Sequence, residues 1–144
     1  MKTLLFTILC IATLQAQTAK ADQILGVWLS ENKEGKIEIY KTASNTYCGK
    51  IVWSKNFYEA DGKTLRKDQH NKDESLRSRP IKNMVILTDF VFEDGHWEDG
   101  HIYDPKNGKT YSCTIKLEGD ALHIRGFIGI SLLGRTTIWT RTTK

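Results

Sequence analysis

The chain is dominated by short runs in which apolar and polar residues alternate, each ended by turn-forming residues. The alternation is clearest at 36–40 and 84–92, which are rich in β-branched and aromatic residues. With the weaker runs, eight strands are predicted: 26–31, 36–42, 46–54, 83–93, 96–103, 109–118, 121–128 and 134–142. Short strands joined by tight turns, with no crossover helix, predict an all-β fold. We expect an eight-stranded up-and-down antiparallel barrel, because closure removes the exposed sheet edges.

The two ends of this pattern predict how the barrel closes. Gly26-Val27-Trp28 opens the first strand, and Trp139-Thr140-Arg141 lies in the last. A meander that closes on itself places the first strand beside the last, which brings Arg141 next to Trp28. A guanidinium over an indole contributes about 0.5–2 kcal/mol, depending on its desolvation. We therefore assign structural roles to Gly26, Trp28, Trp139 and Arg141.

Residues 1–21 have the features of a secretory signal peptide. Lys2 supplies the positive start, the stretch from Leu4 to Leu14 is apolar, and alanines at 16, 19 and 21 offer small-residue cleavage positions. Cleavage after Ala16 and cleavage after Ala21 both fit, and an uncleaved interfacial anchor is the alternative. We predict a secreted protein of the Gram-negative periplasm, with a single domain over 22–144 and no transmembrane segment in the mature chain.

The charge of the mature chain excludes one class of partner. Without residues 1–21 it carries 19 Lys and Arg against 17 Asp and Glu, and the two signs are interspersed. A nucleic-acid-binding domain needs a basic patch or stripe. We therefore expect no nucleic-acid partner, and a domain of this length is expected to be a monomer with one core.

One connection is much longer than the others. Residues 55–82 are charged and lack apolar periodicity, apart from a predicted short helix at 73–78 that Pro80 ends. Connections of this length in a compact domain are functional or disordered. In a meander, the connections after odd-numbered strands lie at one end of the barrel. This end, the odd rim, collects 32–35, 55–82, 104–108 and 129–133, so we expect any open mouth to be there.

Arginines and aromatic residues are the candidates for ligand contact. Arg77, Arg79 and Arg135 reach the odd rim and could bind a carboxylate or phosphate through paired hydrogen bonds. The alternative is that they pair with local acids such as Asp104 and fix the loop. Aromatic residues spaced along several strands suit either a ligand cavity or an interior packed solid, and the chain length favours the packed interior. They are Trp53, Phe90, Tyr103, Tyr111, Phe127 and Trp139.

The sequence contains no motif that identifies a reaction, a metal or a cofactor. Oxygen-bearing side chains in the long connection do not complete a calcium-binding loop, so we expect a solvated acidic stretch; they are Asp61, Asp68, Asn71, Asp73 and Glu74. The histidines have no zinc spacing. No nucleophile elbow is present, and the separation of Asp89, Asp99 and Asp104 is not fixed by the sequence, so a carboxylate pair cannot be assigned.

Cys48 and Cys113 are the two cysteines of the mature chain. A secreted chain permits a disulfide. However, the two residues fall on the third and sixth strands, which are not neighbours in a meander, and they lie on opposite faces. Cysteines with Cα atoms more than about 7 Å apart cannot be bridged without distortion, so we expect both thiols to be free.

Five segments resemble the DUF2147 family of secreted bacterial proteins of uncharacterised function. They are Tyr47-Cys48-Gly49-Lys50-Ile51-Val52-Trp53, Asp68-x-x-Asn71, Leu76-Arg77-Ser78-Arg79-Pro80, Tyr103-Asp104-Pro105-x-Asn107-Gly108-Lys109-x-Tyr111 and Gly134-Arg135-Thr136-x-x-Trp139-Thr140-Arg141. The resemblance covers the whole mature chain and implies a lipocalin-like barrel. The chain departs from the family at Ile81-Lys82-Asn83, where relatives often carry a Leu-Cys-Gly-like triplet, so a bridge from Cys48 to this position is not implied.

These features together predict a lipocalin-like protein that binds a small amphipathic or hydrophobic ligand at the odd rim. The expected ligand contacts are Trp53, Asn71, Arg77, Arg79, Tyr103, Asp104, Tyr111 and Arg135. Two alternatives stay open. One is a structural or partner-binding module of the cell envelope, and the other is a hydrolase acting on envelope material.

Overall fold

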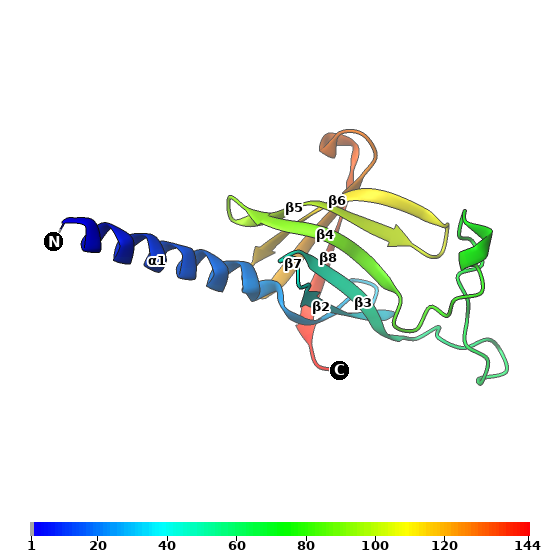
Figure 1. Cartoon of the computed structure of the whole chain (residues 1–144). Coiled ribbons are helices and arrows are strands. Elements are labelled where there is room, and N and C mark those ends of the chain that lie inside the picture. Colours follow the sequence, from blue (N-terminus) through cyan, green and yellow to red (C-terminus); the bar gives the residue numbers. More distant parts are fainter. Residues whose placement is uncertain (1) are drawn as a thin grey trace.

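Eight antiparallel strands form a closed barrel in which each strand pairs with the next and the last pairs with the first (Figure 1). This confirms the predicted fold, and every predicted strand boundary lies within two residues of the observed one. The strands are β1 (Gly26–Leu29), β2 (Gly35–Lys41), β3 (Tyr47–Ser54), β4 (Val85–Glu93), β5 (His96–Asp104), β6 (Lys109–Glu118), β7 (Ala121–Phe127) and β8 (Arg135–Thr142). The computed structural model describes residues 2–144, with side chains described from residue 11 onward.

Helical segments are few and lie outside the barrel wall. The long helix α1 (Lys2–Ala21) extends away from the barrel in Figure 1 and leads into the 3-10 turn η1 (Asp22–Ile24). Two further 3-10 turns are η2 (Glu74–Leu76) and η3 (Ser131–Leu133). Among residues 2–144, no helix has the length and apolarity needed to cross a membrane. The leader assigned to residues 1–21 stays a prediction.

Residues 21–25 cover the end of the barrel opposite the odd rim, which we call the closed end. Ile24 is fully buried there, and Ala21 is nearly so. The indole of Trp28 donates to the Ile24 carbonyl at 2.8 Å, and the indole of Trp97 donates to the Ala21 carbonyl at 3.2 Å. Buried N–H groups need such partners, because an unpaired polar group in an apolar interior costs about 1–3 kcal/mol. Two core indoles therefore tie this segment to the barrel.

The pairing of β1 with β8 places Arg141 directly opposite Trp28, as the closed meander predicted. The guanidinium carbon of Arg141 lies 4.1 Å from the centre of the indole ring. The same guanidinium donates to the carbonyls of Leu25 at 2.9 Å and Gln23 at 2.7 Å. Gly26 adopts φ +125°, and a Cβ there would lie 2.9 Å from a guanidinium nitrogen of Arg141. Glycine at this position thus gives the arginine room to reach both carbonyls.

The two cysteines of the barrel are free, which confirms the prediction. Cys113 is buried on the inner face of β6, whereas Cys48 is half-buried on the outer face of β3. Strands β3 and β6 are separated by β4 and β5. Burial raises the pKa of the Cys113 thiol to about 12.

The long connection between β3 and β4 is folded against the odd rim. Its two limbs run antiparallel, with backbone hydrogen bonds from Asp68 to Arg79 (3.0 Å) and from Ile81 to Arg66 (2.9 Å). The predicted helix at 73–78 is the shorter turn η2, and Asp73 caps it by accepting from the Ser75 amide at 3.0 Å. Gly108 touches the His70 carbonyl so closely that a Cβ there would clash with it. The connection is therefore held against the β5–β6 turn.

Candidate functional site

A cavity of about 920 Å³ opens at the odd rim and extends into the barrel. Its inner wall is apolar and is formed by Ile37, Ile51, Ile86, Ile102, Ile124 and Trp139. The expectation of an interior packed solid is therefore wrong at the odd rim, where this cavity stays open. The large side chains of Trp28, Phe90 and Trp97 lie toward the closed end, and the inner positions nearer the rim hold smaller residues such as Gly126 and Thr137. A barrel of about eight strands can then hold one small ligand.

Polar and charged side chains ring the mouth of this cavity. Four of the predicted contacts lie there: Tyr103, Asp104, Tyr111 and Arg135. Asp104 also forms the β5–β6 turn by accepting from the Lys106 amide and the Asn107 side chain, each at 2.9 Å. The Tyr111 hydroxyl accepts from the same Asn107 amide group at 3.1 Å.

The charges at the mouth do not all cancel. Lys106 lies 3.5 Å from Glu34, and Arg66 lies 3.6 Å from Glu59. Within residues 11–144, Lys67 and Arg135 also line the cavity but form no salt bridge. Among the residues described from 11 onward, the mouth therefore presents two cations without a salt bridge, against one such carboxylate, that of Asp104.

Trp53 lies outside the cavity, contrary to its predicted role in ligand contact. If side chains alternated strictly along β3, the side chain of Trp53 would lie on the inner face with those of Tyr47 and Ile51. The pairing with β2 shifts at Lys36/Ile37, so that Ile51 faces Ile37 while Trp53 faces Lys36. This β-bulge inserts one extra residue and reverses the side-chain faces beyond it. The indole is 40% exposed, with the Lys36 ammonium 5.9 Å from its centre, and Ser54 lines the cavity instead.

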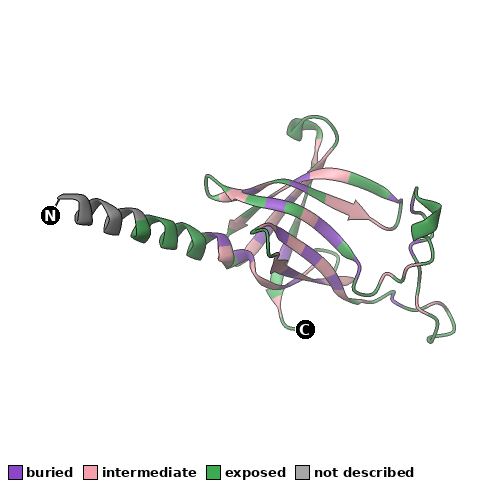
Figure 2. Cartoon of the chain, viewed as in Figure 1, coloured by how far each residue is buried: buried purple, intermediate pink, exposed green. Residues whose placement is uncertain are grey.

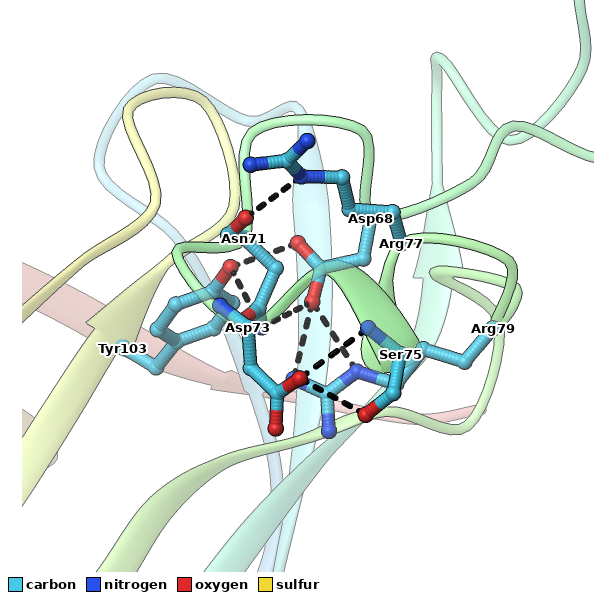
Figure 3. Close-up of polar contacts among 7 residues, drawn as sticks. All are labelled: Asp68, Asn71, Asp73, Ser75, Arg77, Arg79 and Tyr103. Carbon is cyan, nitrogen blue, oxygen red and sulfur yellow. Dashed lines mark hydrogen bonds and ion pairs between the residues drawn. The ribbon is translucent and has the colours of Figure 1, made fainter.

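Asn71, Arg77 and Arg79 gather in a second cluster, centred on the carboxylate of Asp68 (Figure 3). Asp68 is fully buried. It accepts from the Tyr103 hydroxyl at 2.6 Å and from the Asn71 amide group at 2.7 Å. Two nitrogens of Arg79, Nε and Nη2, lie 2.9 Å from its Oδ2 atom. All of these partners except Tyr103 come from the long connection, so Tyr103 joins the connection to the barrel wall.

The environment of Asp68 keeps it ionised. Burial alone would raise the pKa of this carboxyl, but the hydrogen bonds from Tyr103, Asn71 and Arg79 and the charge of Arg79 outweigh burial and lower it. In turn, burial and the Asp68 carboxylate raise the pKa of the Tyr103 hydroxyl to about 12. The tyrosine is therefore a permanent hydrogen-bond donor to Asp68 near neutral pH.

The three arginines occupy different settings. Arg79 pairs with Asp68 and lies over the Tyr103 ring, at 5.6 Å. Arg77 donates to the Asn71 carbonyl at 2.8 Å and lies 3.2 Å from Glu74. Arg135 alone lines the cavity. Arg77 and Arg79 thus have the loop-fixing contacts of the alternative interpretation, although their acidic partners are Glu74 and Asp68 rather than Asp104.

Asp68 is the main residue of this region that the predicted site omitted. The long connection was expected to be a solvated acidic stretch, and this is wrong for Asp68, which is enclosed by its hydrogen-bond donors. The spacing Asp68-x-x-Asn71 was visible in the sequence, but nothing local indicated that Arg79 and Tyr103 would meet it. Asp61 instead forms a local turn, accepting from the amides of Lys63 and Thr64 at 2.9 Å. Among the described residues, no group of three His, Cys, Asp or Glu side chains could hold a metal ion.

Comparison with known structures supports the architecture. The chain is similar to protein HP1028 from the human pathogen Helicobacter pylori, which belongs to the lipocalin family. The two share 19% sequence identity, with a TM-score of 0.71 over 85% of this chain and 84% of that one. At this identity the similarity concerns the fold alone. No match was found among curated proteins.

A family profile identifies the chain more closely than the fold does. The profile of DUF2147, described as an uncharacterized protein conserved in bacteria, matches residues 26–141. This span runs from the first residue of β1 to the arginine that lies over Trp28. The protein therefore belongs to the DUF2147 family and has a lipocalin-like β-barrel.

Proposed function

We propose that the protein binds a small amphipathic ligand in the barrel, with the apolar part of the ligand against the isoleucine wall. The observation that carries this proposal is the cavity itself, which is apolar inside and polar at its mouth. Ligand sites in proteins typically combine an apolar lining with a few placed polar groups. A module that served only as a structural element would not need an open cavity at the rim.

The polar end of the ligand is expected to be anionic. Arg135 and Lys67 are the cations of the mouth without a salt bridge among the described residues, and Arg135 begins the strand that carries Thr137 and Trp139 down the cavity wall. Arginine binds carboxylates and phosphates through paired hydrogen bonds. Arg79 supports the site indirectly, because Asp68 and Tyr103 occupy its guanidinium.

Titration with 11-(dansylamino)undecanoic acid, a fluorescent single-chain carboxylate, tests this proposal. We expect saturable binding at one site. Arg135→Ala should weaken binding about tenfold through loss of a charge-assisted hydrogen bond, and Ile124→Asp should abolish it. Arg125→Ala serves as the matched control, because this arginine lies on neighbouring β7 and donates to Ser131 and Thr136. Equal binding by the Arg135→Ala and Ile124→Asp variants and the unmodified protein would contradict the proposal.

We also propose that this site works outside the cytoplasm. The support is the predicted leader at residues 1–21, whose positive start, apolar stretch and alanines fit a signal peptide. Intact-mass measurement of the protein from its host's extracytoplasmic fraction tests this, with the mass of a chain beginning at 17 or 22 expected. Native mass spectrometry of the same sample would reveal a retained ligand. Recovery of an uncleaved chain only in the cytoplasm would contradict extracytoplasmic function.

A further inference from the structure

The connection between β7 and β8 exposes more apolar side-chain surface than any other described part of the barrel. Its four large apolar residues, the apolar tip, are Ile128, Ile130, Leu132 and Leu133. They are between 59% and 82% exposed, whereas the other exposed large apolar residues of 22–144 reach at most 44%. Contiguous exposed apolar groups on a small protein mark a contact surface.

Hydrogen bonds hold the backbone of this connection, and its large apolar side chains are exposed. Arg125 donates from Nε to the Ser131 carbonyl at 2.7 Å, from Nη2 to the Leu132 carbonyl at 3.3 Å and from Nη1 to the Thr136 hydroxyl at 2.9 Å. The turn η3 adds a backbone hydrogen bond from Leu133 to Ile130 at 3.2 Å. Arg125 therefore donates hydrogen bonds to two backbone carbonyls of the loop. The four apolar side chains of the tip stay mostly exposed.

The tip is a protrusion rather than a groove. In Figure 1 the loop between β7 and β8 stands clear of the barrel wall, and Figure 2 shows much of it exposed. A stable protein–protein interface requires about 800 Å² on each partner. A narrow projection carrying four aliphatic side chains is better suited to insertion into the interfacial region of a lipid bilayer.

The surrounding charge also fits a lipid surface. The long connection at the same rim, residues 55–84, carries eight Lys and Arg against five Asp and Glu. The tight turns of the closed end carry Asp94 and Asp120 and no basic residue. Membrane-surface binding combines buried apolar area with attraction of cations to anionic headgroups. The odd rim offers both, whereas the tight turns of the closed end offer neither.

We propose that the apolar tip inserts into anionic lipid bilayers and holds the odd rim, with its cavity mouth, at the membrane surface. The proposal is independent of ligand binding, because it rests on the tip and on the charge of the rim. It also predicts the side from which an amphipathic ligand would reach the cavity.

Partitioning of the full chain onto vesicles tests the proposal. The vesicles contain equal parts of phosphatidylglycerol and phosphatidylcholine, with phosphatidylcholine alone for comparison. Leu132→Asp/Leu133→Asp should reduce partitioning onto the mixed vesicles about tenfold or more, because two leucine side chains are no longer transferred from water into the bilayer. Val85→Asp/Val91→Asp is the matched control, since it also introduces two aspartates at exposed apolar positions, here on β4, and should have little effect. Partitioning should also fall with added salt and with the neutral vesicles.

A local measurement separates the tip from α1, which could itself contact lipid. Hydrogen–deuterium exchange of the full chain should show slower exchange at 127–134 when mixed vesicles are added, and this protection should be lost in Leu132→Asp/Leu133→Asp. Equal partitioning of both double variants and the unmodified chain, or unchanged exchange at 127–134, would overturn the proposal. Self-association that the tip variant abolishes, without any vesicle-dependent protection, would assign the tip to a second copy of the chain and would also overturn it.

Discussion

The two ends of the barrel differ in the residues that line them and in how tightly those residues pack. At the closed end, the indoles of Trp28 and Trp97 bond to backbone carbonyls of residues 21–25, and Arg141 lies over Trp28. At the odd rim, aliphatic walls enclose a cavity, and the polar groups belong to a folded connection centred on Asp68. Tight packing is concentrated at the closed end, whereas the odd rim keeps an open cavity.

The largest expected effect is the loss of a closed-end indole. Trp28→Ala should lower the free energy of unfolding by about 3–5 kcal/mol, because it empties a fully buried site and removes the partner of Arg141. Ile86→Ala, on the cavity wall, should cost only about 2 kcal/mol, at the low end for such changes, because its side chain has fewer packing partners on the cavity side. Urea denaturation of both variants measures the difference. Equal losses would mean that the cavity half is as tightly packed as the closed end.

The next effect distinguishes the arginines of the odd rim. Arg79→Ala should cost about 1–3 kcal/mol, since it leaves the buried Asp68 charge with fewer donors. The value is below that of a fully buried pair, because the Arg79 side chain is 38% exposed and solvent screens it. Arg77→Ala, the matched change two residues away, should cost less than about 1 kcal/mol. Thermal melts of the two variants measure this difference. An unchanged melting temperature for Arg79→Ala would contradict its structural role and favour the predicted role of Arg79 in ligand contact.

A smaller effect should appear in acid. The pKa of Asp68 is lower in the folded chain than its ordinary value, so its contribution to stability is present above the unfolded pKa of about 3.9 and is lost as the pH falls through the folded pKa. Melts between pH 7 and pH 2 should therefore show a loss below about pH 4. Asp68→Asn should be less stable at pH 7 and lose less on acidification. Parallel pH profiles for the two proteins would show that Asp68 does not contribute this dependence.

The smallest effect concerns the cysteines, whose modification should follow burial. Iodoacetamide should label Cys48 of the folded, unreduced chain readily, whereas Cys113 should react slowly because it is buried with a raised pKa. Peptide mapping after labelling identifies the sites. Cys48 that becomes reactive only after reduction would indicate a disulfide and contradict the observed separation of β3 and β6.

The barrel could be predicted from the sequence because its strands are specified locally. The alternation of apolar and polar residues and the turn residues both lie within runs of about ten residues. Whether a connection follows an odd- or an even-numbered strand then decides at which end of the barrel it lies. The positions of the candidate site residues depend on features that the alternation of apolar and polar residues does not reveal. One extra residue in β3 turns Trp53 outward, and the Asp68 cluster joins residues up to 35 positions apart. The division between a packed half and an open half likewise depends on side-chain size at each level of the barrel.

The contact of Arg141 with the first strand also has a consequence for the order of folding. Its hydrogen bond to the Leu25 carbonyl joins residues 116 positions apart, which is nearly the full length of the barrel domain. Contacts at such separation form slowly, because the intervening chain must first lose its freedom. Hairpins between consecutive strands can form as soon as both are available, but β1 has no partner on its second edge until β8 exists. We therefore expect the pairing of β1 with β8 to form after the hairpins between consecutive strands.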